Sequence, residues 1–92
     1  MIMIREYLGN SPRIKVLEFL IFNRAKSYGV KEILMGAKVK HRNLIIILND
    51  MLKKDIIYIE KKLGKSNLYR INEFEPFAQS LIFAADMGMN QS

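Results

Sequence analysis

The sequence predicts an α+β fold, mostly helical, with a three-helix core, a β-hairpin and an additional C-terminal helix. Apolar residues recur at spacings of three and four in three segments before residue 55, which is typical of helices that bury one face. Two short segments rich in β-branched and aromatic residues then flank a turn around Gly64, as in a hairpin. A last apolar segment opens at Pro76, and the length of 92 residues suits a single domain.

The first helix is expected to begin at Gly9–Pro12 and to end at Asn23. Glycine interrupts the preceding segment, Asn10 or Ser11 can cap the helix, and proline fits its first position. The apolar residues of this segment form one broad side that should be buried. They are Ile14, Val16, Leu17, Phe19, Leu20 and Ile21.

A second helix over Val30–Gly36 and a third over Lys40–Lys54 are expected to follow an extended link at Lys26–Gly29. The second helix has only about two turns and is expected to stop at its glycine. The turn between the two helices contains small residues, and the third helix begins in a basic stretch. This pattern is typical of a helix-turn-helix unit.

The inward face of the third helix should consist of Leu44, Ile47, Leu48 and Met51. Adjacent positions in a helix diverge by about 100°, so Ile45 and Ile46 cannot both join that face. The apolar surface left over could touch thymine methyl groups, pack under the N-terminal segment, contact another subunit or complete a tightly wrapped core. The sequence leaves these alternatives open.

The hairpin is expected to consist of strands Ile56–Glu60 and Leu68–Ile71, joined by a turn over Lys61–Asn67. The last helix is apolar around much of its circumference, so it needs a partner surface. We therefore divide the single domain, 1–92, into four parts. These are an N-terminal segment (1–10), the core (11–72), the C-terminal helix (74–87) and a tail (88–92) that is expected to be disordered.

Basic charge is concentrated in two blocks of the chain. The net charge is +6 and the sequence pI is near 9.7. Residues 24–42 carry a net +5 and residues 53–70 a net +4, whereas residues 71–92 carry −3. This distribution favours a polyanionic partner such as nucleic acid. The alternative, from charge alone, is that the lysines only keep an apolar protein in solution.

The sequence shows no sign of an enzyme, and we expect no catalytic residues. It has no cysteine and one histidine, and it lacks a Walker-type loop, a glycine-rich dinucleotide turn and a recognisable carboxylate pair. We therefore expect no metal, no cofactor and no small-molecule ligand. No apolar run approaches the roughly 18 to 20 residues of a membrane span. The first residues include Arg5 and Glu6 and lack a cleavage site, so we expect no secretory signal and a cytoplasmic location.

Two segments of the chain carry a resemblance to a known family. They are LGNSPRIKVLEFL at residues 8–20 and GKSNLYRIN at residues 64–72. They are similar to the first helix, and to the wing with its outgoing strand, in the winged helix-turn-helix family of DNA-binding proteins, in detail the small archaeal winged-helix transcriptional regulators. The resemblance covers most of the chain. Asp55 stands where this family usually has a left-handed glycine after the recognition helix, a conformation that aspartate tolerates better than most residues.

The resemblance implies that the third helix enters the major groove of double-stranded DNA and that the wing lies on the backbone or in a minor groove. Hydrogen-bond donors at the start of that helix are then candidate base readers: Lys40, His41, Arg42 and Asn43. The candidate wing contacts are Lys61, Lys62, Lys65, Ser66 and Asn67. Candidate contacts with the DNA backbone elsewhere are Arg24, Lys26, Lys31 and Lys38. The alternative is that these side chains are solvated surface groups.

The apolar residues near the two ends exceed what a three-helix core can bury. We therefore expect a homodimer through the terminal segments, with Ile2, Ile4, Tyr7, Phe77, Leu81 and Phe83 at its interface. Two-fold symmetry would suit a palindromic DNA site. The predicted function is that of a dimeric, sequence-specific transcriptional regulator.

Two alternatives to that function remain. A winged helix can bind another protein, and this differs from DNA binding in being insensitive to salt. A non-specific architectural protein can coat DNA, and this differs in showing little preference for a target duplex over a random one.

Overall fold

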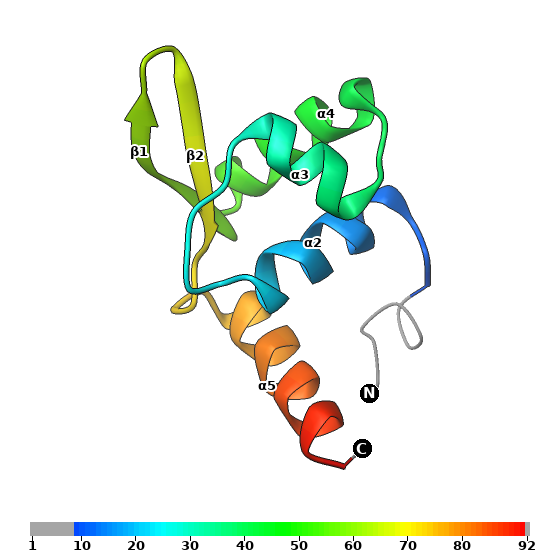
Figure 1. The fold of residues 1–92 in the computed structure, drawn as a ribbon. Coiled ribbons are helices and arrows are strands. Elements are labelled where there is room, and N and C mark those ends of the chain that lie inside the picture. Colours follow the sequence, from blue (N-terminus) through cyan, green and yellow to red (C-terminus); the bar gives the residue numbers. More distant parts are fainter. Residues whose placement is uncertain (1–8, 92) are drawn as a thin grey trace.

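The computed structural model describes residues 9–91, and the side chains of residues 9–87. Within this range the elements are α2 (Pro12–Phe22), α3 (Val30–Ala37), α4 (His41–Lys53), β1 (Ile57–Leu63), β2 (Ser66–Ile71) and α5 (Pro76–Gln91). The described part of the chain is thus mixed α+β and mostly helical, with four helices and a two-stranded antiparallel hairpin, as predicted. The hairpin tip and α5 lie at opposite ends of the molecule (Figure 1).

The hydrophobic core lies where α2, α3 and α4 meet the base of the hairpin. Its largest fully buried side chains are Val16, Leu17, Leu20, Ile21, Ile33, Leu44, Leu48, Met51, Ile57 and Ile71. The inward face predicted for α4 is confirmed, because its four residues are all buried. The helix α5 adds Ala78, Leu81 and Ala85 to the same cluster.

The predicted bounds of the first helix are confirmed in α2. The hydroxyl of Ser11 accepts a hydrogen bond from the backbone N–H of Ile14 at 3.3 Å, and Pro12 is the first helical residue. Asn23 caps the other end, where its side-chain amide donates to the carbonyl oxygen of Phe19 at 2.8 Å. Local capping chemistry therefore fixes both ends of α2.

The prediction that Gly36 ends the second helix is wrong. The helix α3 continues to Ala37, and Lys38 terminates it in the left-handed conformation, with φ of 57°. Gly36 instead allows a close approach of α2, because a Cβ atom at this position would lie 2.0 Å from Cε1 of Phe19. The glycine is needed for helix packing and not for termination.

The end of α4 has the conformation expected from the resemblance. Asp55 adopts φ of 59°, in the left-handed region. The side-chain amide of Asn72 donates to the carbonyl oxygen of Asp55 at 2.9 Å, and the N–H of Ile56 donates to the carbonyl oxygen of Met51 at 3.0 Å. These bonds attach the last turn of α4 to the base of the hairpin, where Ile56 precedes β1 and Asn72 follows β2.

The hairpin is longer than predicted. We expected a turn over Lys61–Asn67, but β1 runs to Leu63 and β2 starts at Ser66, so that only Gly64 and Lys65 form the turn. Gly64 has φ of 62°, which glycine adopts without strain. The part of β1 that contains Lys61 and Lys62 was not predicted, because an exposed hairpin arm lacks the alternation of apolar and polar residues that marks a half-buried strand.

The extended link before α3 pairs with the hairpin. Tyr28 and Tyr69 form an antiparallel bridge, in which each backbone N–H donates to the other residue's carbonyl oxygen, at 2.8 and 2.7 Å. The ring of Tyr28 also meets that of Phe19 edge to face at a centroid distance of 5.2 Å. The link therefore couples the hairpin to α2.

The helix α5 extends to Gln91, beyond the predicted end at Met87. Residues 88–91 were expected to belong to a disordered tail, but glycine costs only about 1 kcal/mol in a helix interior and the following residues permit a helix. Ile2, Ile4, Tyr7 and Ser92 lie outside the described residues. None of the helices in residues 9–91 combines the length and the apolar character needed to cross a membrane.

Candidate nucleic-acid interface

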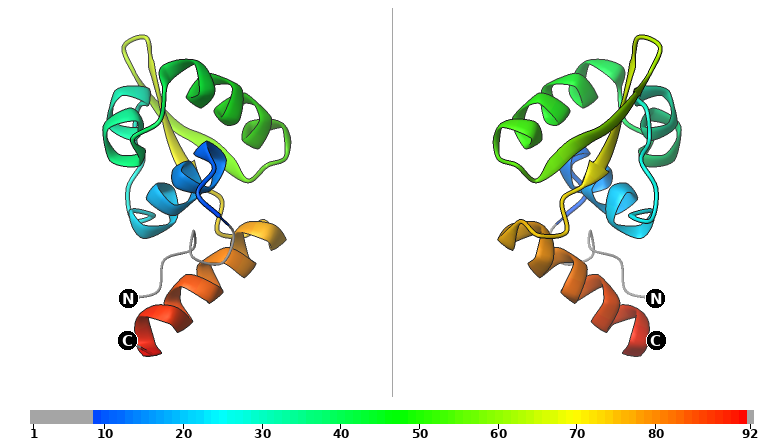
Figure 2. Two further views of the ribbon diagram at one scale, coloured as in Figure 1. Left: turned by 90° about the vertical axis from the view of Figure 1, so that its right-hand side faces the viewer. Right: turned by 90° about the vertical axis from the view of Figure 1, so that its left-hand side faces the viewer.

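The outward side of α4 presents a single row of exposed residues: Arg42, Ile46, Asn49 and Lys53. They follow one another at steps of four, three and four residues. At about 100° per residue these positions fall within an arc of about 60°. Figure 2 shows that α4 and the hairpin tip lie at the same end of the molecule, away from α5.

The four predicted base readers do not all share this row. Lys40 is the N-cap residue and His41 the first helical residue, and both are exposed together with Arg42. Asn43 is half-buried and lies beside Ser11 and Pro12 at the start of α2. The sequence prediction missed Asn49 and Lys53, which helical spacing from Arg42 would have found.

The candidate wing residues lie on the two arms and the tip of the hairpin. Lys61 and Lys62 lie on β1, Lys65 is in the turn, and Ser66 and Asn67 begin β2. All of them are exposed except Asn67, which is half-buried. In Figure 2 the tip projects beyond the first turn of α4, so these side chains can reach a surface that α4 also touches.

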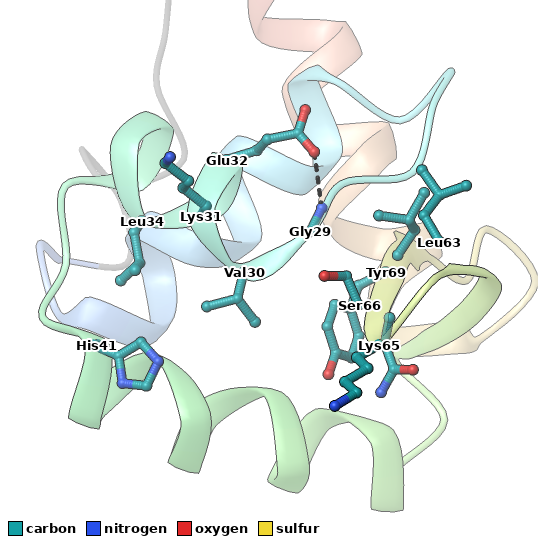
Figure 3. Close-up of a pocket in the computed structure, with 12 residues that line it drawn as sticks. Gly29, Val30, Lys31, Glu32, Leu34, His41, Leu63, Lys65, Ser66 and Tyr69 are labelled. Atoms are coloured by element: carbon teal, nitrogen blue, oxygen red, sulfur yellow. Dashed lines mark hydrogen bonds between the residues drawn. The ribbon is translucent and has the colours of Figure 1, made fainter.

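A hollow of about 690 Å³ joins the hairpin to the start of α4 and to α3. In Figure 3, Val30 and Leu34 extend from α3 toward α4, while His41 and Lys65 border the hollow from α4 and from the hairpin. Glu32 turns away and accepts a hydrogen bond from the N–H of Gly29 at 3.1 Å. The first turn of α4 and the hairpin tip therefore belong to one continuous surface.

The carboxylate on α4 is neutralised by neighbouring cations. Asp50 lies 2.6 Å from Arg13 and 3.1 Å from Lys54, measured between carboxylate oxygen and side-chain nitrogen. Hydrogen bonds from Lys54 and then from Arg13 lower the pKa of Asp50 below its usual value. The carboxylate therefore stays ionised and paired beside the outward row.

The carboxylate on the hairpin is neutralised in the same way. Glu60 lies at the bulge in β1 and 2.6 Å from Arg70, whose side chain also donates to the carbonyl oxygen of Arg24 at 2.9 Å. Hydrogen bonds from Arg70 and then from Ser27 lower the pKa of Glu60, and the same pairing raises the pKa of Arg70. The guanidinium of Arg70 is thus used in contacts within the protein, with Glu60 and with the backbone of Arg24.

The remaining cations of this end have no direct acidic partner among the described residues. Lys40, Arg42, Lys53, Lys62 and Lys65 form no ion pair with a described residue, and Lys61 acts on Glu60 only through its charge, without a direct contact. Because Asp50 and Glu60 are already paired, these cations give α4 and the hairpin a net positive charge.

The candidate backbone contacts divide into two groups. Lys26, Lys31 and Lys38 are exposed. Arg24, in contrast, donates to both carboxylate oxygens of Asp86 at 2.9 and 3.0 Å and to the carbonyl oxygen of Ile21 at 3.0 Å. Its guanidinium joins α2 to α5, so we remove Arg24 from the candidate DNA contacts.

The predicted dimer residues also divide. Leu81 is only 7% exposed and belongs to the protomer's own core, so its predicted place at a dimer interface is wrong. Phe77 and Phe83 are exposed on α5, together with Met87. Ile2, Ile4 and Tyr7 lie outside the described residues.

Nowhere in the described part of the chain do three side chains of the metal-binding types gather closely enough to hold an ion. A scan against models of protein families and a search of curated proteins both find no match to the chain. Its function must therefore be inferred from the geometry of its own residues.

Proposed function

We propose that the protein is a winged-helix transcriptional regulator that binds double-stranded DNA and catalyses no reaction. In this proposal α4 enters the major groove, and Arg42 and Asn49 face the base edges. The hairpin lies on the phosphate backbone or in the adjacent minor groove, where its lysines meet phosphates.

One observation carries this proposal. The outward row of α4 and the lysine-bearing hairpin tip lie at the same end of the molecule, and the carboxylates Asp50 and Glu60 beside them are paired with cations. A helix is the element that fits the major groove, and a flanking basic hairpin can follow the backbone beside it.

The connectivity supports the winged-helix assignment. Three helices, an extended segment bridged to the hairpin through Tyr28, and a hairpin directly after α4 occur in the order that the resemblance implies. The left-handed Asp55 between α4 and β1 occupies the position where a glycine is usual. These features support a fold-level analogy, and the DNA-binding proposal depends on the surface residues.

The proposed regulator is a homodimer through α5. One face of this helix spans about 120° and contains Phe77, Ser80, Phe83, Ala84 and Met87, with no charged residue. Small residues at the middle of a helix face let a second helix approach closely, while the flanking aromatic rings bury apolar area. A two-fold pair of protomers would present two copies of α4 to half-sites separated by a turn of DNA.

The test of the proposal uses a duplex selected from a random pool by the purified protein, and a scrambled duplex of equal length. We expect Arg42→Ala to weaken binding to the selected duplex by about 5- to 150-fold, the range for losing one bidentate base contact. Binding to the scrambled duplex should fall by less, because there the variant loses only a charge contact and no base contact. Fluorescence anisotropy at fixed salt measures both.

The matched control is Lys65→Ala, which removes a cation from the hairpin tip. We expect this variant to weaken binding to both duplexes by the same factor, because phosphates are present in every sequence. Equal losses from Arg42→Ala on the two duplexes would contradict base reading by α4. A wild-type protein that binds both duplexes equally would favour the coating function instead.

A further inference from the structure

Ile46 is the apolar member of the outward row of α4. Its side chain is 59% exposed, although the neighbouring Ile47 and Leu48 are buried. Arg42 lies one turn before it, and Asn49 and Lys53 follow it on the same side. Ile46 therefore takes no part in the core, and folding alone would allow a polar residue here.

The surroundings of Ile46 provide room for a small apolar group. Ile46 and Ile47 line a hollow of about 310 Å³ together with Asn43 and with Ser11, Pro12 and Arg13 at the start of α2. The hydrocarbon of Ile46, Ile47 and Pro12 thus forms an apolar spot, while Arg42 and Lys53 provide positive charge along the same row. A second copy of this chain would bring the same cations against each other, whereas a polyanion would be attracted to them.

The chemistry of the major groove restricts what can meet this spot. Base edges there present hydrogen-bond donors, acceptors and one apolar group, the C5-methyl group of thymine. An isoleucine pressed against a guanine, adenine or cytosine edge would cover polar atoms without bonding to them. Against thymine it would bury one methyl group from water.

We propose that Ile46 contacts the C5-methyl group of a thymine and thereby makes α4 select an A·T pair at that position. This inference rests on the proposed DNA binding and identifies the residue and the atom that set one position of the target. Arg42, one turn nearer the N-terminus and about 6 Å along the helix axis, reads an adjacent position on the same face.

The experiment replaces each thymine of the selected duplex, one at a time, by deoxyuridine, which lacks only the methyl group. We expect one replacement in each half-site to weaken wild-type binding about fourfold, the factor expected for burying a methyl-sized group. Ile46→Ala should bind the thymine and deoxyuridine duplexes equally, and Ile46→Val should retain most of the difference. Met35→Ala, which shortens another exposed apolar side chain, on α3, should lose as much affinity as the wild type when thymine is replaced by deoxyuridine.

Several results would overturn the inference while leaving DNA binding intact. In the first, the wild type prefers the selected duplex but no replacement of thymine by deoxyuridine weakens its binding. In the second, Ile46→Ala loses as much affinity as the wild type when thymine is replaced by deoxyuridine. A fall in molecular mass of Ile46→Ala in sedimentation, with unchanged base preference, would assign Ile46 to an interface between copies. Absence of all binding to duplex DNA at low salt would instead overturn the proposed function, and this inference with it.

Discussion

Gly36 controls how closely two helices of the core can approach. The ring of Phe19 occupies the space where a side chain at this position would begin, with Cδ1 at 2.4 Å from an ideal Cβ atom. Glycine weakens a helix interior by about 1 kcal/mol relative to alanine, so the packing of α2 on α3 must outweigh that loss. The residue is retained for the contact and not for backbone conformation.

We expect Gly36→Ala to lower the free energy of unfolding by about 1 to 2 kcal/mol. Overpacking against Phe19 costs about 1 to 3 kcal/mol, and the better helix propensity of alanine returns up to about 1. Urea unfolding measures the change. Met35→Ala, at the exposed neighbouring position, should change stability by less than about 0.5 kcal/mol. A Gly36→Ala protein as stable as the wild type would show that Phe19 moves aside without loss.

Residues whose role is local were predictable from the sequence, and residues whose role depends on a distant partner were not. The cap at Ser11 and Pro12 depends on its immediate neighbours. Arg24 was expected at DNA because its partner Asp86 lies 62 residues away in the chain. A pair so far apart in the chain cannot be predicted from the residues around either member.

At the scale of elements, α4 separates its two roles by helical spacing. Residues at one set of positions enter the core, while Arg42, Asn49 and their neighbours in the row remain exposed. The inward face was predictable because burial follows apolar spacing. The outward row was predicted only in part, because Asn49 and Lys53 lie beyond the first turn and a lysine at the end of a helix is already explained by the helix dipole.

The helix α5 carries the apolar face through which we propose dimerisation. Phe83 is 68% exposed on this face, so an aspartate there should not disturb the protomer's core. We expect wild-type protein at micromolar concentration to sediment as a dimer and Phe83→Asp as a monomer, because a charge would have to be buried between the helices. Met35→Asp, an equivalent change on α3, should remain a dimer. A wild-type monomer at that concentration would contradict the proposed interface.

At the scale of the whole molecule, charge is divided between two ends. The end formed by α4 and the hairpin carries several cations that form no ion pair, whereas the acidic Glu73, just before α5, and Asp86, on α5, bind Arg24. The sequence indicated this division, since its basic blocks precede an acidic last segment. The shared surface of α4 and the hairpin could not be predicted from the sequence, because their proximity depends on how the hairpin packs beside α3.

The salt dependence of binding to a labelled duplex, followed by fluorescence anisotropy from about 50 to 200 mM salt, tests the DNA-binding proposal most directly. Each phosphate contact contributes about −0.9 to the slope of log affinity against log salt concentration, so phosphate contacts from about three to six of the cations at this end should give a slope of about −3 to −5 per protomer. We expect the measured slope to fall within that range. No binding at 50 mM salt, or a slope near zero, would contradict the assignment of this surface to DNA.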